Sequence, residues 1–189
     1  MKIALFSDVH ADVKSLKKVI RFLRFQGIAD IYCLGDIIGY GKHPNEVISI
    51  LKKEKIKTIK GNHEKIFLSG KYLKKYNLDY TKKIITKASL EYIHSLPEAI
   101  ELKSCNAILS HAVPGTKDSY HYANSDFSVF DAIKHKIIFL GHSHYPMLMA
   151  YRNKKIINPG SIGQPRDGND KPSFVICDLK KQIFEFLRI

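Results

Sequence analysis

Side chains that commonly bind metal ions occur at five places in the chain, each directly after a short apolar run. They are two carboxylates, one carboxamide and four imidazoles, with no thiolate, and this mixture suits Mn, Fe, Zn or Co better than a cysteine-bound structural zinc. One ion rarely needs seven protein ligands, whereas two ions about 3.5–4 Å apart would use them all and are a device for hydrolysing phosphate esters. The residues are Asp8 and His10, Asp36, Asn62, His111, and His142 and His144.

Each of these side chains also has an ordinary structural interpretation. Asp8 and Asp36 could be turn or cap residues, Asn62 could cap the helix that follows it, and any single His could be a satisfied polar residue. Taken together, these interpretations require every strand end to carry a ligand by accident. Nothing in loop chemistry calls for the His-Ser-His sequence that follows Gly141. We therefore expect a metal site.

Alternating strands and helices are predicted to position these residues. Apolar residues recur at helical spacing from Val13 until Gly27, with Asp12 as the expected N-cap, and Pro44 begins a second helix. Such alternation favours right-handed crossovers and a largely parallel sheet, in which the carboxyl ends of the strands face one crevice. Strands are expected at residues 1–6, 31–34, 57–60, 107–110 and 137–140, and helices at 13 to just before 27, 44–53, most of 67–96, and 127–134.

The C-terminal third has a different pattern, because short strands follow one another there without helices between them. These strands are expected at 147–151, 155–158, 173–178 and 183–187, paired largely antiparallel. The expected fold class is α/β, with two packed mixed β-sheets flanked by helices. At 189 residues and 21.6 kDa, a single domain over 1–189 is expected.

The formal net charge is +13, which would suit an anionic partner. Only five of the 31 basic residues are Arg and the Lys residues are spread along the chain, so a solvated Lys-rich surface is favoured over a nucleic-acid site. The expected location is cytoplasmic without a membrane association, because no segment resembles a secretory signal or a membrane span. Cys33, Cys105 and Cys177 are expected to be buried free thiols.

The sequence resembles the calcineurin-like metallophosphoesterases. Their signature is Asp-x-His, Gly-Asp, Gly-Asn-His-Asp/Glu, His and Gly-His-x-His, and all five blocks occur in this order between residues 8 and 144. Residues 35–47 and 158–166 are similar to the small prokaryotic phosphodiesterase-like (YfcE-type) branch. The resemblance implies a four-layer αββα sandwich. It also implies a phosphodiesterase with a dinuclear centre, Mn being favoured over Fe, Zn, Co or Ni, and a metal-bridging water or hydroxide as nucleophile.

The resemblance also implies roles for individual residues. It places one ion on Asp8, His10, Asp36 and His144 and the other on Asp36, Asn62, His111 and His142, so that Asp36 bridges them. His63 is then the catalytic residue that stabilises phosphoryl charge or protonates the leaving alkoxide, and its alternative is a surface loop histidine. For Glu64, orienting the His63 imidazole and interacting with the helix dipole are about equally plausible.

Several residues near these blocks are less specific. Phosphoprotein phosphatases have an Asp and an Arg where this chain has Gly39 and Tyr40, which weakens a serine/threonine phosphatase function and leaves phosphate to the metals and to Arg166 or a nearby Lys. Gln164 is a second candidate substrate contact. The segment from Tyr120 to Tyr122 either forms a lid that stacks on a nucleobase or aryl group or, as we favour, is an ordinary packed loop.

Three hypotheses of function follow. A two-metal hydrolase acting on a small phosphate ester or nucleotide leads, as a phosphodiesterase ahead of a phosphomonoesterase or nucleotide phosphatase. The second is a non-catalytic binding subunit with the same fold, like the retromer component of this family, and the third is a nuclease or nucleic-acid binder. The sequence leaves the substrate, the metal and a homo-oligomeric state open.

Overall fold

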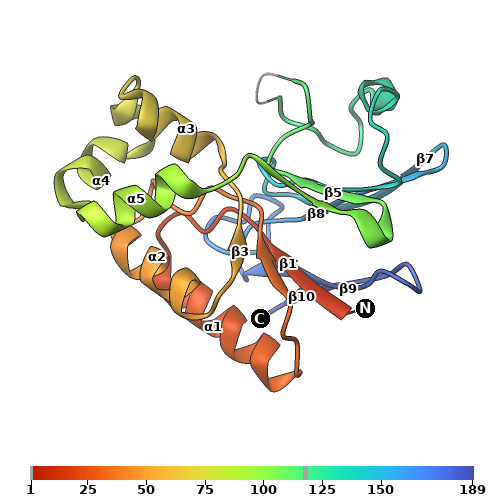
Figure 1. The fold of residues 1–189 in the computed structure, drawn as a ribbon, viewed down its shortest axis with the longest axis horizontal. Coiled ribbons are helices and arrows are strands. Elements are labelled where there is room, and N and C mark those ends of the chain that lie inside the picture. The colour runs from red at the N-terminus through yellow and green to blue at the C-terminus, as the bar shows by residue number, and fades with distance from the viewer. Residues whose placement is uncertain (1, 117–118) are drawn as a thin grey trace.

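Two five-stranded sheets form the centre of the molecule, as a computed structural model of residues 2–116 and 119–189 shows (Figure 1). The first sheet has the order β10-β9-β1-β2-β3. Neighbours β1, β2 and β3 are parallel, and β9 joins β1 and β10 antiparallel. Its strands are β1 (Lys2–Phe6), β2 (Ile31–Cys33), β3 (Lys57–Thr58), β9 (Ser173–Asp178) and β10 (Ile183–Arg188).

The second sheet has the order β4-β5-β6-β8-β7. Strands β5, β6 and β8 are parallel, while the edge strands β4 and β7 pair antiparallel with their neighbours. The expected antiparallel pairing of the C-terminal strands is therefore correct except for β8 beside β6. The strands are β4 (Ala99–Leu102), β5 (Ala107–Ser110), β6 (Ile137–Phe139), β7 (Pro146–Tyr151) and β8 (Lys154–Pro159).

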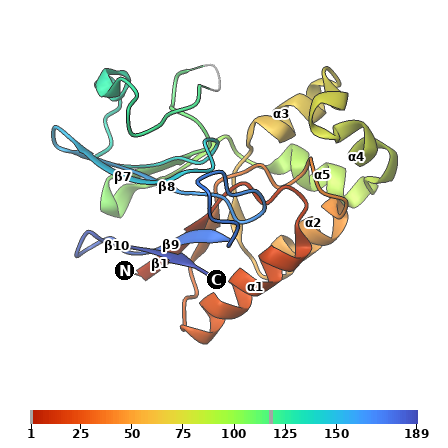
Figure 2. The same cartoon turned by 180° about the vertical axis from the view of Figure 1, so that it is seen from behind.

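Clusters of apolar side chains fill the spaces between the layers of the molecule. One cluster, including Leu5, Leu109 and Val175, fills the space between the two sheets. A second cluster joins the first sheet to the helices, which lie on its other face in both views (Figures 1 and 2). A third covers the outer face of the second sheet through Phe130 and Ile133. The expected αββα sandwich is confirmed, with a one-turn 3-10 helix and loops as its fourth layer.

The helices follow from periodicity and capping. In α1 (Val13–Phe25) the residues Leu16, Val19 and Leu23 are buried, and the Asp12 side chain accepts a hydrogen bond from the Ser15 amide at 3.0 Å, as expected of its N-cap. The expected helix over 44–53 is α2 (Pro44–Lys53). The remaining helices are α3 (Asn62–Ser69), the 3-10 helix η1 (Leu73–Tyr76), α4 (Leu78–Ile84) and α5 (Lys87–Ser95).

Residues 67–96 are mainly helical, as expected, and the left-handed conformations of Gly70 and Asn77 divide the segment into successive short helices. The structure differs from the sequence-based expectations at residues 127–134 and at Cys105. The expected helix over 127–134 is only the 3-10 helix η3 (Phe127–Phe130). Cys105 is half-buried because it ends the 3-10 helix η2 (Lys103–Cys105) instead of lying in a strand, so the expectation of three buried thiols is wrong there.

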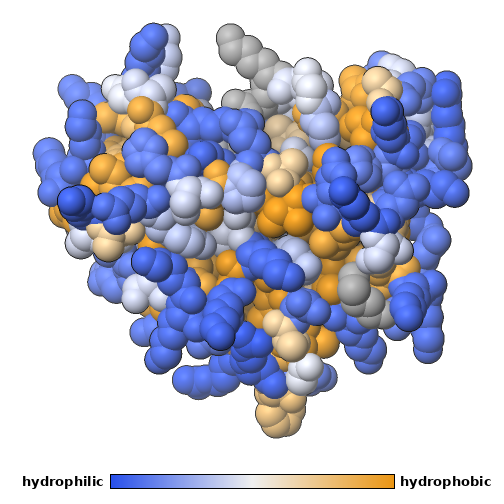
Figure 3. All heavy atoms as spheres, viewed as in Figure 1, coloured by the Kyte–Doolittle hydropathy of each residue, from blue (hydrophilic) through white to orange (hydrophobic). Residues whose placement is uncertain are grey.

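The surface is rich in hydrophilic side chains, which lie over both halves of the face drawn in Figure 3 with apolar residues between them. Among the described residues, no helix combines the length and the apolar character that crossing a membrane requires.

Candidate metal centre

The loops after β1, β2, β3, β5 and β6 meet at one place and bring all seven expected ligand residues together. Three groups of side chains there have ligand atoms that lie within 4.8 Å of one another. The groups are Asp8, His10 and His144; Asp36, His111 and His142; and His10, Asp36 and His63. The first two groups match the two ion sites expected from the sequence, apart from Asn62 and the bridging position of Asp36.

The first group is held by contacts between the two sheets. His144 Nε2 lies 3.3 Å from Asp8 Oδ1 and 3.2 Å from His10 Nε2. The other carboxylate oxygen, Asp8 Oδ2, accepts a hydrogen bond from the His142 amide at 3.2 Å. Asp8 therefore joins the loop after β1 to the loop after β6.

The second group surrounds Asp36. His111 Nε2 lies 3.4 Å from Asp36 Oδ2 and 3.0 Å from Asn62 Oδ1. The rings of His111 and His142 are in edge contact, with centroids 5.1 Å apart. The other oxygen, Asp36 Oδ1, accepts a hydrogen bond from the His63 amide at 2.9 Å. Asn62 is the first residue of α3, and Gly61 is the N-cap, so Asn62 does not serve as the helix cap.

The imidazoles share one orientation. The Nδ1 atom of His111 lies 2.7 Å from the Leu34 carbonyl oxygen, and that of His144 lies 2.6 Å from the Gln164 carbonyl oxygen. His10 makes the same kind of contact at 3.4 Å, with the Ile38 carbonyl oxygen. A proton on Nδ1 leaves Nε2 facing the carboxylates, where it can bind a metal ion once it has lost its own proton, and this arrangement fixes the tautomer of metal-binding histidines.

The charges of the group are strongly coupled. Burial alone would raise the pKa of Asp36, but the imidazoles around it, first His111, hold it well below the usual range. The pKa of Asp8 is likewise lowered, by His144 above all, against the effect of burial. Burial lowers the pKa of His10 to about 3, whereas Asp36 overcomes burial and raises the pKa of His111 to about 10. Both carboxylates are therefore ionised and can attract cations.

The donor set fits divalent metal ions. Asp8 is fully buried, yet its Oδ1 atom has no well-aligned hydrogen-bond donor among the described residues. A buried carboxylate oxygen without a donor is costly unless a cation binds it. The remaining donors are carboxylate, carboxamide and imidazole, which suit Mn, Fe, Zn or Co.

Backbone conformation supports the same conclusion. Left-handed φ values cost non-glycine residues roughly 1–3 kcal/mol each and cluster at functional sites. Five of the seven expected ligand residues have them: Asp8 at 55°, His10 at 49°, Asp36 at 51°, His142 at 69° and His144 at 63°.

Glu64 connects two of the loops. Its fully buried carboxylate accepts hydrogen bonds from the amides of residues 36–38 at 2.9–3.2 Å and from the Gly61 amide at 2.7 Å. Burial, and then the charge of Asp36, raise the pKa of Glu64 to about 7. Because both oxygens bind these amides, the interpretation that Glu64 orients the His63 imidazole is wrong. Its position in the first turn of α3 was recognised, but its contacts with the other loop were not.

His63 lies inside the centre and is not a surface loop residue. It is 2% exposed, its Nδ1 lies 3.0 Å from the Ile38 carbonyl oxygen, and its Nε2 lies 3.7 Å from Asp36 Oδ2. Burial lowers its pKa. A Cβ atom on Gly39 would come within 2.1 Å of His63 Nδ1, so the position where phosphoprotein phosphatases carry an Asp has no room for a side chain here.

The expected substrate contacts lie beside the centre. Arg166 donates a hydrogen bond to Gln164 Oε1 at 3.1 Å. Burial raises the pKa of Tyr40 overall, although the charge of Arg166 lowers it. Tyr40 contacts the rings of His10 and His63, with centroids 4.8 and 5.0 Å away. A cavity of about 840 Å³ opens next to His10, Tyr40 and Gln164 and continues along the first turns of α1 and α2.

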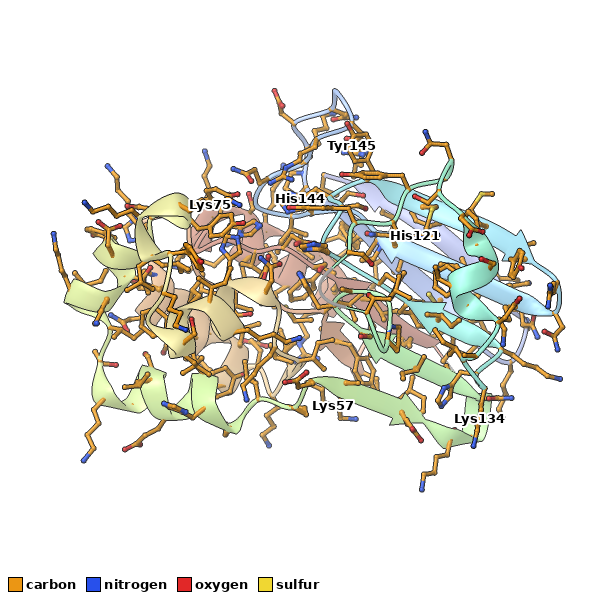
Figure 4. All side chains as sticks on the ribbon, turned by 90° about the horizontal axis from the view of Figure 1, so that it is seen from above. Lys57, Lys75, His121, Lys134, His144 and Tyr145 are labelled. Carbon is orange, nitrogen blue, oxygen red and sulfur yellow. The ribbon has the colours of Figure 1, made fainter. Side chains whose placement is uncertain are left out.

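Residues outside the sequence blocks were harder to place. The sequence did not single out Ser161, yet its hydroxyl donates to the Asp8 carbonyl oxygen at 2.7 Å and fixes the loop after β1. Three further histidines, His43, His94 and His135, belong to none of the three groups. In the view of Figure 4, His144 lies between Lys75, on the side of the helices, and His121 and Tyr145, on the side of the second sheet.

A comparison with protein families decides the classification. The family model described as the calcineurin-like phosphoesterase superfamily domain matches residues 1–182. The chain belongs to this superfamily. A relative of the chain, the MJ0912 protein of Methanocaldococcus jannaschii, is 35% identical over an alignment of 211 residues, which covers 99% of this chain and 86% of the relative.

Solved structures share the calcineurin-like fold. A metallophosphoesterase from Sphaerobacter thermophilus has a TM-score of 0.86 at 26% identity, over 100% of this chain and 88% of that one. The phosphoesterase Yfce from E. coli has a TM-score of 0.62 at 17% identity, over 100% of both chains. Vps29 from Entamoeba histolytica has a TM-score of 0.57 at 17% identity, over 100% and 99%. The last two show likeness of fold alone.

Proposed function

We propose that the protein is a phosphodiesterase that uses two divalent metal ions, with Mn favoured. The proposal depends on one observation: one group of ligand atoms surrounds Asp8 and another surrounds Asp36, each carboxylate has an imidazole Nε2 within 3.4 Å, and a third group, of His10, Asp36 and His63, connects the two. One ion would bind Asp8, His10, Asp36 and His144, and the other Asp36, Asn62, His111 and His142. When bound, such ions stabilise phosphoryl charge and lower the pKa of water.

Residues of the chain would supply the rest of the chemistry. His63 would face the phosphoryl group from the side of Asp36, where its imidazole can stabilise negative charge or pass a proton to the leaving oxygen. Arg166, held by its hydrogen bond to Gln164, would bind a non-bridging phosphate oxygen.

A diester is favoured because two separate hollows border the centre. The cavity beside His10 and Gln164 measures about 840 Å³, and a second hollow of about 470 Å³ lies beside Ser143 and Tyr145. The two have no lining residue in common, so each could hold one of the two ester groups.

The test combines metal binding with turnover. Apo protein would be titrated with Mn by calorimetry, and hydrolysis of bis(p-nitrophenyl) phosphate and p-nitrophenyl phosphate would be followed with Mn and with a chelator. We expect two Mn ions per chain, faster cleavage of the diester, and loss of turnover on chelation. Asp36→Asn should weaken binding of both ions, and His63→Ala should slow turnover roughly 10²- to 10⁴-fold while still binding Mn. His94→Ala, at an exposed histidine of α5 that lines neither hollow, is the matched control.

Other outcomes would identify another function. Faster cleavage of the monoester would favour a phosphomonoesterase or nucleotide phosphatase. Failure to bind Mn or Zn, together with a stable co-purifying protein, would favour a binding subunit. Salt-sensitive binding of single-stranded nucleic acid with cleavage would favour a nuclease.

A further inference from the structure

A hollow of about 470 Å³ lies beside the loop that carries two of the candidate ligands, His142 and His144. The segment from His121 to Asn124 forms one side of it, and the segment from Ser143 to Met147 forms the other. Ser143 stands between the two histidines in the sequence, so a molecule in this hollow would be a direct neighbour of the metal centre.

Two aromatic rings form a corner of the hollow. The rings of Tyr122 and Tyr145 meet edge to face, with centroids 5.5 Å apart and planes at 83°. Tyr145 is 40% exposed although it is a large aromatic residue, and Met147, only 6% exposed, also lines the hollow. A flat heteroaromatic group can stack on one ring of such a corner while its edge contacts the other.

A buried imidazole adds polarity to this apolar corner. His121 is 7% exposed, and its Nε2 atom is buried without a hydrogen-bond partner among residues 2–116 and 119–189. Its ring is held between Phe127 and Phe130, each in edge contact at 4.7 Å. Burial lowers its pKa, so the neutral ring offers one donor and one acceptor nitrogen. An unpaired buried polar atom is costly, so a ligand in the hollow that reached it would supply the missing hydrogen bond.

A row of rings connects the hollow to the metal centre. Tyr120 stacks on His142 with centroids 4.0 Å apart and planes at 15°. Tyr122 lies next to Tyr120, with centroids 6.2 Å apart and planes at 9°. This row gives the segment from Tyr120 to Tyr122 a fixed position relative to the centre. From the sequence, we favoured an ordinary packed loop for this segment.

We propose that this hollow binds the nucleobase of a nucleotide substrate. The base stacks in the corner of Tyr122 and Tyr145 and hydrogen-bonds to His121 and to the amide of Asn124, while its phosphate lies at the metal centre. The position of the phosphate rests on the proposed function, whereas the base-binding site rests on the hollow itself. The +13 net charge is compatible with an anionic substrate of this kind.

Equilibrium binding tests the proposal without turnover. The dissociation constants of adenosine 5′-monophosphate and ribose 5-phosphate would be measured by calorimetry on the Mn-loaded protein. Adenosine and ribose would be measured in parallel on the chelated protein. We expect each base-containing ligand to bind roughly 5- to 100-fold more tightly than its partner without a base, the range for stacking one base on aromatic side chains.

Variants locate the effect. Tyr122→Leu and Tyr145→Leu should each reduce the preference for the base severalfold, whereas Tyr122→Phe should retain it. His121→Phe keeps a ring between Phe127 and Phe130 but removes the ring nitrogens that would hydrogen-bond to the base. It should therefore reduce the difference in affinity between adenine and uracil nucleotides. Tyr72→Leu, at a tyrosine that is 79% exposed, is the matched control. Circular dichroism and the melting temperature identify variants that fail to fold.

Equal affinity for ligands with and without the base would overturn the proposal, as would equal effects of Tyr145→Leu and Tyr72→Leu. The two proposals fail separately. Adenosine that binds through Tyr122 and Tyr145 while no ester is hydrolysed supports the base site and rejects the phosphodiesterase. Metal-dependent hydrolysis without any preference for the base supports the phosphodiesterase and rejects the base site.

Discussion

Replacing Glu64 by Gln would test how firmly the loops after β2 and β3 are joined. The carboxylate accepts hydrogen bonds from four backbone amides, those of residues 36–38 and of Gly61, inside the protein. Glutamine has nearly the same shape but only one acceptor oxygen. Its NH₂ group would face two amide donors, whichever way the side chain is turned.

The expected loss of stability can be worked from these four contacts. Two amides lose their acceptor, at about 1–3 kcal/mol each, and the other two exchange an ionised acceptor for a neutral one, at about 1 kcal/mol each. Part of this loss is offset, because burial and the charge of Asp36 raise the pKa of Glu64 from 4.5 to about 7 and removing the buried charge therefore restores about 3 kcal/mol. We therefore expect Glu64→Gln to lower the free energy of unfolding by about 1–5 kcal/mol, against the 5–15 kcal/mol that is typical of a protein domain. The variant should also bind Mn more weakly, because the Asp36 amide is one of the four donors.

Urea unfolding of the chelated protein at about pH 8 is the assay, since Glu64 is then mostly ionised. The matched control is Glu98→Gln, which makes the same chemical change at a carboxylate that is 72% exposed and 3.3 Å from Lys65. An exposed pair of this kind contributes about 0–1 kcal/mol. If the two variants unfold within about 1 kcal/mol of each other, the four hydrogen bonds do not hold the loops as argued.

Two further predictions concern buried side chains. Burial raises the pKa of the thiols of Cys33 and Cys177, so these thiols should not react in the native protein. Ellman's reagent should modify only the half-buried Cys105 in the native protein, and all three thiols in guanidinium. Peptide mapping that finds Cys33 or Cys177 modified in the native protein would contradict this. Burial lowers the pKa of His121 below its ordinary 6.5, so the unfolded state binds the proton more tightly and stability is lost as the pH falls below about 6.5. Between about pH 7 and pH 5, the stability of His121→Phe should therefore fall less steeply than that of the wild type. Urea midpoints of the two proteins that change in parallel with pH would refute this prediction.

The fold and the ligand cluster could be predicted because both depend on local patterns. Alternating apolar runs and helical periodicity located most strands and helices, and the carboxyl ends of parallel strands had to meet. The strand β4 was missed because it is a four-residue edge strand whose residues are exposed or half-buried in alternation. The mainly helical character of 67–96 was predicted, but its division into short helices at the left-handed residues Gly70 and Asn77 was not.

Other features of the site depend on contacts that the sequence does not reveal. The carboxylate of Glu64 binds backbone amides of another loop, and backbone amides have no side-chain signature. His121 is an ordinary-looking histidine between two tyrosines, and only the packing of Phe127 and Phe130 around it shows that its Nε2 is buried. The hollow beside it is formed by two segments that are 19 positions apart in the chain, residues 121–124 and 143–147.

The ligand groups are divided between the two sheets. Asp8 and His10 follow β1 in the first sheet and His144 follows β6 in the second, while Asp36 and His111 are divided in the same way. The group of His10, Asp36 and His63 lies within the N-terminal half of the chain, but neither of the two groups proposed to hold the ions is complete there. During synthesis, the full metal affinity would therefore appear only when residues 137–144 have been added and the sheets have docked. The affinity for metal would thus report the final step of assembly, and a fragment ending before β6 would bind Mn far more weakly than the whole chain.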